Sequence, residues 1–316
     1  MNRVSSEGLA HERGLSESRP IASQRTLIWT AWIATLLLSK LPLVIARDLL
    51  GGDIPRITQW WIGAAALFFA ATFVWRTLAP LRGYFAVMGV ILLATTVFDP
   101  WVSGSAAWQN LFAGGNPLVD LLGQRVVIAL SAVIVVAALL LMGYTRREAF
   151  LTTGELTAPV KGFRLPGREK PVTWIGFGVA MALLLGGLFF LFMASQNPAA
   201  LSALGAALPW LPLVLLCAAL NAFGEEAMYR AAPLATLLSP VGPRHALWMT
   251  SVWFGLGHYY GAIPSGLIGA VFSGLLGLLL GKAMLDTRGI GWPWIIHVIL
   301  DTVIYLFIAM SFVYSG

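Results

Sequence analysis

The sequence predicts an all-α protein: a polytopic transmembrane helix bundle of about eight to nine spans, with its N-terminus in the cytoplasm. Of the 316 residues, 58% are hydrophobic and only 11% are charged, whereas about 25% of the residues of a soluble protein are charged. A chain of this composition cannot cover its apolar surface in water, which excludes a soluble enzyme, a disordered protein and a nucleic-acid-binding protein as first interpretations. We therefore expect the lipid bilayer, and no nucleic acid, among its partners.

Nine apolar runs predict the individual spans, since about 20 apolar residues cross a bilayer as a helix. Asp99 and Pro100 interrupt the third run, so residues 101–124 are alternatively a re-entrant or interfacial segment. Residues 1–25 are polar and Ser-rich, which predicts a disordered cytoplasmic tail. The nine runs cover residues 26–46, 57–75, 84–106, 126–144, 173–194, 209–233, 246–262, 265–283 and 292–312.

The distribution of Lys and Arg predicts the orientation. With the N-terminus inside, sixteen of the 20 Lys and Arg residues fall on the inner side, Arg47, Arg56 and Arg125 fall on the outer side, and Lys40 lies within the first span. Cytoplasmic loops carry such an excess, so we expect an integral protein of a bacterial cytoplasmic (inner) membrane. The basic loop 146–172 separates transmembrane helices of unassigned role, residues 26–145, from residues 173–316, whose spans hold several ionisable groups.

Three of these ionisable groups lie in the sixth span. Side chains that ionise inside hydrocarbon are costly, so each one indicates a functional site. Glu226 and Arg230 are four residues apart and can pair on one helix face, whereas Glu225 points about 100° away from Glu226. Glu225 is then the carboxylate without an arginine partner, which suits a general base. The alternative is that both glutamates belong to a buried salt-bridge cluster.

The other three groups are His258 in the seventh span and His297 and Asp301 in the ninth. His297 and Asp301 are four residues apart, so both face the same neighbouring helix. At 1.5 Å per residue, Glu225, His258, His297 and Asp301 lie roughly 8 to 18 Å from the inner ends of their spans. This overlap in depth predicts one shared pocket. The alternative is that the histidines only pack in the core.

These residues form three motifs that resemble those of the CPBP (CAAX protease and bacteriocin-processing, or Abi) family of intramembrane proteases. The EExxxR motif reads Glu225 to Arg230, the FxxxH motif reads Phe254 to His258, and the HxxxD motif reads His297 to Asp301. The resemblance covers roughly residues 170 to 312, with each motif in an apolar span. It marks residues 173–316 as a protease core.

The resemblance implies an intramembrane endopeptidase that hydrolyses peptide bonds of a membrane-associated peptide or lipidated protein near the cytoplasmic face. It assigns water activation to Glu225 with His258, and oxyanion stabilisation to His297 with Asp301. Glu226, Arg230 and Phe254 then support these groups. An aspartate can donate a hydrogen bond only if it is protonated, so Asp301 alternatively holds His297 in its donor form or binds a metal.

The cofactor and the class of function each keep an alternative. Glu225, His258 and His297 could form a three-ligand zinc site with an open position for water; the resemblance points to a reaction without bound metal, and no HExxH motif is present. Buried Glu, His and Asp also build the proton relays of a proton-coupled transporter, although the inverted repeats common in transporters are not visible. A third reading is a non-catalytic membrane scaffold or immunity protein.

Overall fold

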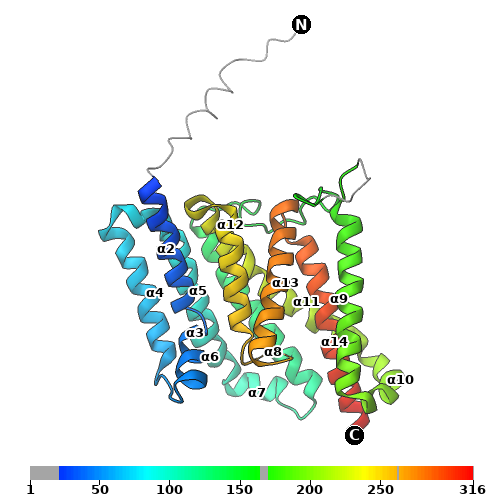
Figure 1. Cartoon of the computed structure of the whole chain (residues 1–316). Helices are drawn as coiled ribbons and strands as arrows, with labels where there is room; N and C mark the ends of the chain where they lie inside the picture. Colours follow the sequence, from blue (N-terminus) through cyan, green and yellow to red (C-terminus); the bar gives the residue numbers. More distant parts are fainter. Residues whose placement is uncertain (1–20, 164–169, 262, 316) are drawn as a thin grey trace.

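The computed structural model describes residues 21–163, 170–261 and 263–315, and this part of the chain folds into an all-α bundle (Figure 1). A single β-bridge, between Pro159 and Thr173, is the only strand-like pairing in these ranges. Both findings confirm the predicted fold class. Residues 1–20, most of the predicted tail, lie outside the described residues.

The helical segments follow one another with short connections, except for the loop between α8 and α9. Segments marked η are 3-10 or π turns within or between helices. The N-terminal part contains α2 (Ile21–Leu37), α3 (Leu41–Val44), η1 (Ile45–Leu49), α4 (Ile57–Val74), η2 (Arg76–Leu81), α5 (Arg82–Leu93), η3 (Ala94–Phe98), α6 (Asp99–Ser103), α7 (Ala106–Phe112) and α8 (Pro117–Leu141). The C-terminal part contains α9 (Trp174–Gln196), η4 (Pro198–Ala203), α10 (Leu204–Ala207), η5 (Leu208–Trp210), α11 (Leu211–Glu226), η6 (Ala227–Ala231), α12 (Ala232–Gly257), α13 (Gly266–Thr287) and α14 (Gly291–Ser315).

Seven helices in the described ranges are long and apolar enough to cross a membrane, or eight if the bent pair of α2 with α3 and η1 counts as one span. One of the seven, Pro198–Gly257, has 60 residues. At 1.5 Å per residue it would be ~90 Å long, about three times the hydrocarbon thickness. It reverses at Gly242, whose φ of 81° and ψ of 162° are not helical, and so holds both the sixth and the seventh predicted spans. Nine passes result, which places the start of α2 and the end of α14 at opposite faces of the bundle (Figure 1).

Three element boundaries differ from the sequence prediction. α2 begins at Ile21, inside the predicted tail. The third span continues through Asp99 and Pro100 to Ser103, because a proline at the first turn of a helix removes no helical hydrogen bond. α8 begins at Pro117, where the side chain of Asn116 accepts a hydrogen bond from the backbone N–H of Leu118. The fourth span is therefore longer than predicted and contains Arg125, which was wrongly assigned to an outer loop.

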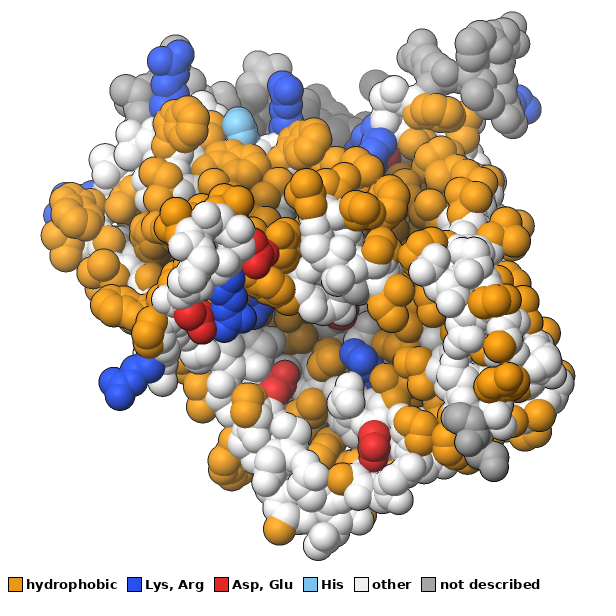
Figure 2. All heavy atoms as spheres, turned by 60° about the horizontal axis from the view of Figure 1, so that its bottom comes forward, with side chains coloured by type: hydrophobic (Ala, Val, Ile, Leu, Met, Phe, Trp, Pro, Cys, Tyr) orange, Lys and Arg blue, Asp and Glu red, His pale blue; other side chains and the backbone are white. Residues whose placement is uncertain are grey.

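Large hydrophobic side chains cover the outside of the bundle. Leu67 is 72% exposed, Leu141 is 89% exposed and Leu183 is 69% exposed. Figure 2 shows hydrophobic side chains over most of the visible face, with charged side chains confined to a few small groups. Exposed apolar surface of this extent marks a membrane-facing protein. The chain is an integral membrane protein.

α11 occupies the position that organises the site, because it packs against both α8 and α14. α14 is fixed on α11 by the indole N–H of Trp294, which donates to the carbonyl of Ala219 at 3.0 Å. α12 packs against α13, and a Cβ added at Gly255 would lie 2.5 Å from the carbonyl oxygen of Ala270. Glycine at position 255 is therefore what permits this close approach of two helices.

Candidate active site

The EExxxR motif lies where α11 passes into a π-helical turn. Glu225 and Glu226 end α11, and the turn η6 follows at once. Such π turns are rare and occur frequently at functional sites. The helix then continues through Pro233 up to the break at Gly242, because i−5 hydrogen bonds already replace i−4 bonds before the proline. Glu225 thus lies 17 residues before the break at Gly242, or ~25 Å at 1.5 Å per residue, which is deeper than the roughly 8 to 18 Å expected from the apolar run.

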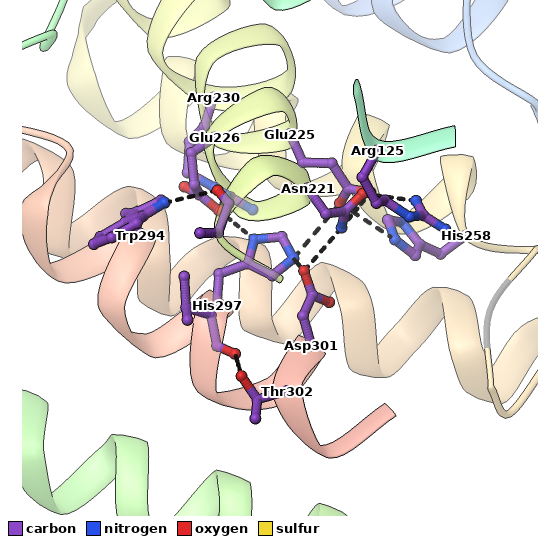
Figure 3. Close-up of polar contacts among 12 residues, drawn as sticks. Arg125, Asn221, Glu225, Glu226, Arg230, His258, Trp294, His297, Asp301 and Thr302 are labelled. Carbon is purple, nitrogen blue, oxygen red and sulfur yellow. Dashed lines mark hydrogen bonds and ion pairs between the residues drawn. The ribbon is translucent and has the colours of Figure 1, made fainter. Parts of the chain in front are cut away.

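Glu226 forms the fully buried half of the polar cluster. Its side chain and that of Arg230 are 0% and 1% exposed, and the two form an ion pair, as the spacing predicts. The same Oε1 atom of Glu226 accepts a hydrogen bond at 2.8 Å from Nδ1 of His297. We call Glu226, Arg230 and His297 the closed half of the cluster. It joins α11, η6 and α14 (Figure 3).

Glu226, not Asp301, fixes the ring of His297. The distance from His297 Nε2 to Asp301 Oδ2 is 3.7 Å, which is too long for a hydrogen bond. The alternative in which Asp301 orients His297 is therefore wrong in this geometry. Asp301 instead accepts a hydrogen bond at 2.9 Å from the side-chain amide of Asn221, so both α14 residues do face α11, as predicted.

Glu225 forms the open half of the cluster together with His258. Oε1 of Glu225 accepts a hydrogen bond at 3.3 Å from Asn221 Nδ2, whereas Oε2 is buried without any hydrogen-bond partner among the described residues. Oε2 lies 3.6 Å from Nε2 of His297 and 3.8 Å from Nε2 of His258. The carboxylate without an arginine partner is thus Glu225, and it faces two imidazole nitrogens.

His258 lies just beyond the last residue of α12 instead of within a helix, as the apolar run had suggested. Its Nδ1 donates to the carbonyl oxygen of Phe254 at 2.9 Å, so that Nε2 of the neutral ring is left as an acceptor. The ring of Phe254 lies 4.3 Å from that of His258 and 4.6 Å from the guanidinium of Arg230, measured to ring centroids. Phe254 therefore links the two halves, which gives the FxxxH spacing a structural reason.

Two residues of this network escaped the sequence analysis. Asn221 donates from one amide nitrogen toward both Glu225 and Asp301, and its oxygen accepts at 2.7 Å from Arg125 of α8. The four-residue spacing from Asn221 to Glu225 was a usable signal, since residues i and i+4 share a helix face. Arg125 gave no such signal, because the predicted fourth span began at residue 126, one residue after it.

A cavity of about 340 Å³ opens beside the open half of the cluster. Glu225, His258 and Phe254 line it on one side. The N-terminal helices also contribute to the lining, which includes Lys40 and Trp61. Helices of unassigned role thus complete the site.

A metal ion at this site would need at least three protein ligands that converge on it. Among the described residues, no group of three His, Cys, Asp or Glu side chains is arranged to hold one. Glu225, His258 and His297 are nevertheless the three residues that approach one another in the cavity.

A buried carboxylate and two imidazoles in one membrane-embedded pocket are groups that can carry acid–base chemistry. Residues 206–303 match the sequence model of a family described as type II CAAX prenyl endopeptidase, Rce1-like. This segment contains all three motifs, and the match supports the resemblance to the CPBP and CAAX protease family. Neither a curated protein nor a solved structure matches the chain significantly.

Proposed function

We propose that the chain is an intramembrane endopeptidase in which Glu225 activates the attacking water. One observation carries the proposal: Oε2 of Glu225 is buried, has no hydrogen-bond partner among the described residues, and lies within 4 Å of two imidazole nitrogens. An acceptor left free in a buried position is costly. A role in catalysis would explain why this oxygen is left without a hydrogen-bond donor.

The geometry supports a specific position for the water. Oε2 of Glu225 and Nε2 of His258 are both acceptors, 3.8 Å apart, and a water between them can donate one proton to each. The lone pairs of that water then point away from both groups, toward a substrate carbonyl. Glu225 takes one proton as the water oxygen bonds to the carbonyl carbon, and His258 orients the water.

His297 serves the oxyanion that forms. Nε2 of His297 donates when the ring is doubly protonated, since Nδ1 already donates to Glu226. Arg230 pairs with Glu226, and Arg125 donates to Asn221, which holds Glu225 and Asp301. A protonated His297 balances the formal charges of the three carboxylates and the two guanidiniums. The amide of Asn221 is already engaged with Glu225 and Asp301 and holds these two carboxylates in place. Donors preorganised in a water-poor site stabilise developing negative charge strongly.

The intermediate collapses when the carbon–nitrogen bond breaks. Glu225 returns its proton to the leaving amine, so that the carboxylate is regenerated and the products are a new carboxyl terminus and a new amino terminus. No other reactant is required.

We place this reaction within a bacterial inner membrane, with the start of α2 and the basic loop between α8 and α9 on the cytoplasmic side. The excess of Lys and Arg on that side supports the orientation. The substrate class that we propose is a membrane-associated peptide or lipidated protein, by analogy with the name of the matched family.

The test uses the purified protein in liposomes with a pool of membrane peptides, followed by mass spectrometry of the products. Wild type should cleave members of the pool, and Glu225→Gln should cleave none while it elutes and unfolds like wild type. If wild type cleaves nothing but binds peptides, a scaffold is the better description. Proton-coupled uptake that persists in the absence of cleavage would indicate a transporter.

A further inference from the structure

The wall of the cavity carries a cation that its surroundings do not neutralise. Lys40 lies at the break between α2 and α3, two segments bent by 53°, and it lines the same cavity as Glu225. Its ammonium sits 4.8 Å from the ring centroid of Trp61. Among the described residues it forms no ion pair and no side-chain hydrogen bond.

The acidic side chains that follow in the sequence are engaged elsewhere. Asp53 pairs with Arg47 at 2.9 Å. Asp48 accepts a hydrogen bond from the hydroxyl of Tyr260 at 3.3 Å. A charged amine inside a membrane span is costly unless it meets an anion, so the position of Lys40 calls for a negative group from outside the chain.

A second donor without an acceptor lies beside it. Trp61 is 5% exposed, and its indole N–H is buried with no hydrogen-bond partner in the described part of the chain. The hydroxyl groups of Thr95 and Thr96 also line the cavity. They already donate hydrogen bonds to backbone carbonyls of their own helix, those of Ile91 and Leu92. The unused donors of this wall are thus Lys40 and Trp61.

We propose that Lys40 and Trp61 form an anion-binding end of the cavity that takes a carboxylate of the peptide substrate. The inference rests on the proposed function, which supplies the peptide. The lining of the cavity contains both the donors Lys40 and Trp61 and the acceptor Glu225, and its volume of about 340 Å³ suits a short segment. When the carboxylate is the C-terminal one, the scissile bond lies close to the end of the chain. When it belongs to an Asp or Glu side chain, the cleavage is internal.

The experiment measures binding separately from cleavage. The full chain with Glu225→Gln is titrated with decapeptide pools whose last four residues are randomised among apolar amino acids, made with a free C-terminal carboxylate or with a C-terminal amide. A third pool carries the amide and one internal glutamate. Lys40→Met, Lys40→Arg and Trp61→Phe are compared with Lys161→Met, which removes a lysine from the exposed loop between α8 and α9.

The free acid should bind about 10- to 100-fold more tightly than the amide, as expected for one charge-assisted hydrogen bond. Lys40→Met should abolish this preference, Lys40→Arg should retain it, Trp61→Phe should reduce it, and Lys161→Met should leave it unchanged. If the pool with the C-terminal amide and an internal glutamate binds as tightly as the free acid, the carboxylate site is retained. A side-chain carboxylate can then occupy it.

Equal binding of acid and amide overturns the carboxylate site, as does a Lys40→Met variant that weakens both equally or an absence of binding to all pools. Cleavage by wild type of acid and amide at equal rates would remove the site but leave the peptidase intact. Acid-selective binding without any cleavage would leave the site and remove the peptidase.

Discussion

The two halves of the polar cluster contain adjacent glutamates in opposite settings. Glu226 is fully buried, paired with Arg230 and bonded to His297. Glu225 is 15% exposed and keeps one oxygen free beside the cavity. The side chains are chemically identical, so the environment alone separates a positioning group from a reactive one. The closed half holds the helices and the imidazole in place, and the open half is available to substrate.

The largest effect is expected from breaking the closed half. Glu226→Gln leaves Arg230 buried without its counter-charge and His297 without its carboxylate partner. Removal of one partner of a buried ion pair costs about 3–5 kcal/mol. We expect cleavage to be lost together with a matching fall in the free energy of unfolding, measured by thermal denaturation in detergent. Glu155→Gln on the exposed loop is the control. A Glu226→Gln protein with the stability and cleavage rate of wild type would contradict the division of the cluster into a closed and an open half.

The open half should show the reverse pattern. His258→Ala removes one hydrogen bond of a side chain that is 28% exposed, so stability should fall by no more than about 1.5 kcal/mol. The cleavage rate should fall about 100- to 10,000-fold, the usual contribution of a positioned acid–base group. His245→Ala, which removes the acceptor for the Trp32 indole, should cleave normally. A His258 variant that loses stability and activity in proportion would be structural instead.

A smaller effect should connect the N-terminal helices to the open half. Asn221→Leu removes the donor to Glu225 and Asp301 and leaves Arg125 unpaired, so we expect a decrease of about 10- to 100-fold in cleavage rate. Arg125→Met should have a weaker effect of the same kind. In a double-mutant cycle the two changes should be less than additive. Full additivity would show that Arg125 does not act through Asn221.

No effect is expected from metal removal. Dialysis against a strong chelator should leave the cleavage rate within about twofold of the untreated enzyme, since the proposed steps use side chains alone. Loss of activity that added zinc restores would replace the water position between Glu225 and His258 with a metal site.

The sequence was informative wherever spacing along one helix decides a contact. The nine apolar runs correspond to nine passes, and the four-residue spacings of Glu226 with Arg230 and of His297 with Asp301 gave the right faces. The free carboxylate of Glu225 followed from the 100° rotation between neighbours. These inferences need only the geometry of a single helix.

Contacts between distant segments were not predictable in this way. Arg125 meets Asn221 across 96 residues of sequence, and Lys40 reaches the cavity of Glu225 from the first span. The π turn at residues 227–231 carries the helix past Pro233, so the depth of Glu225 was underestimated. Such features depend on how helices pack, which no local pattern encodes.

The composition of the cavity wall has a consequence for how such an enzyme can diversify. Residues 206–303, which match the family, hold the reacting groups that we propose, whereas Lys40 and Trp61 of the proposed carboxylate site lie far upstream in the chain. In these two proposals, the residues for peptide hydrolysis and the residues for substrate selectivity lie in separate segments of the chain. Replacing the N-terminal helices with those of another protein should therefore change which peptides are cleaved. The hydrolysis carried out by residues of the C-terminal helices should continue.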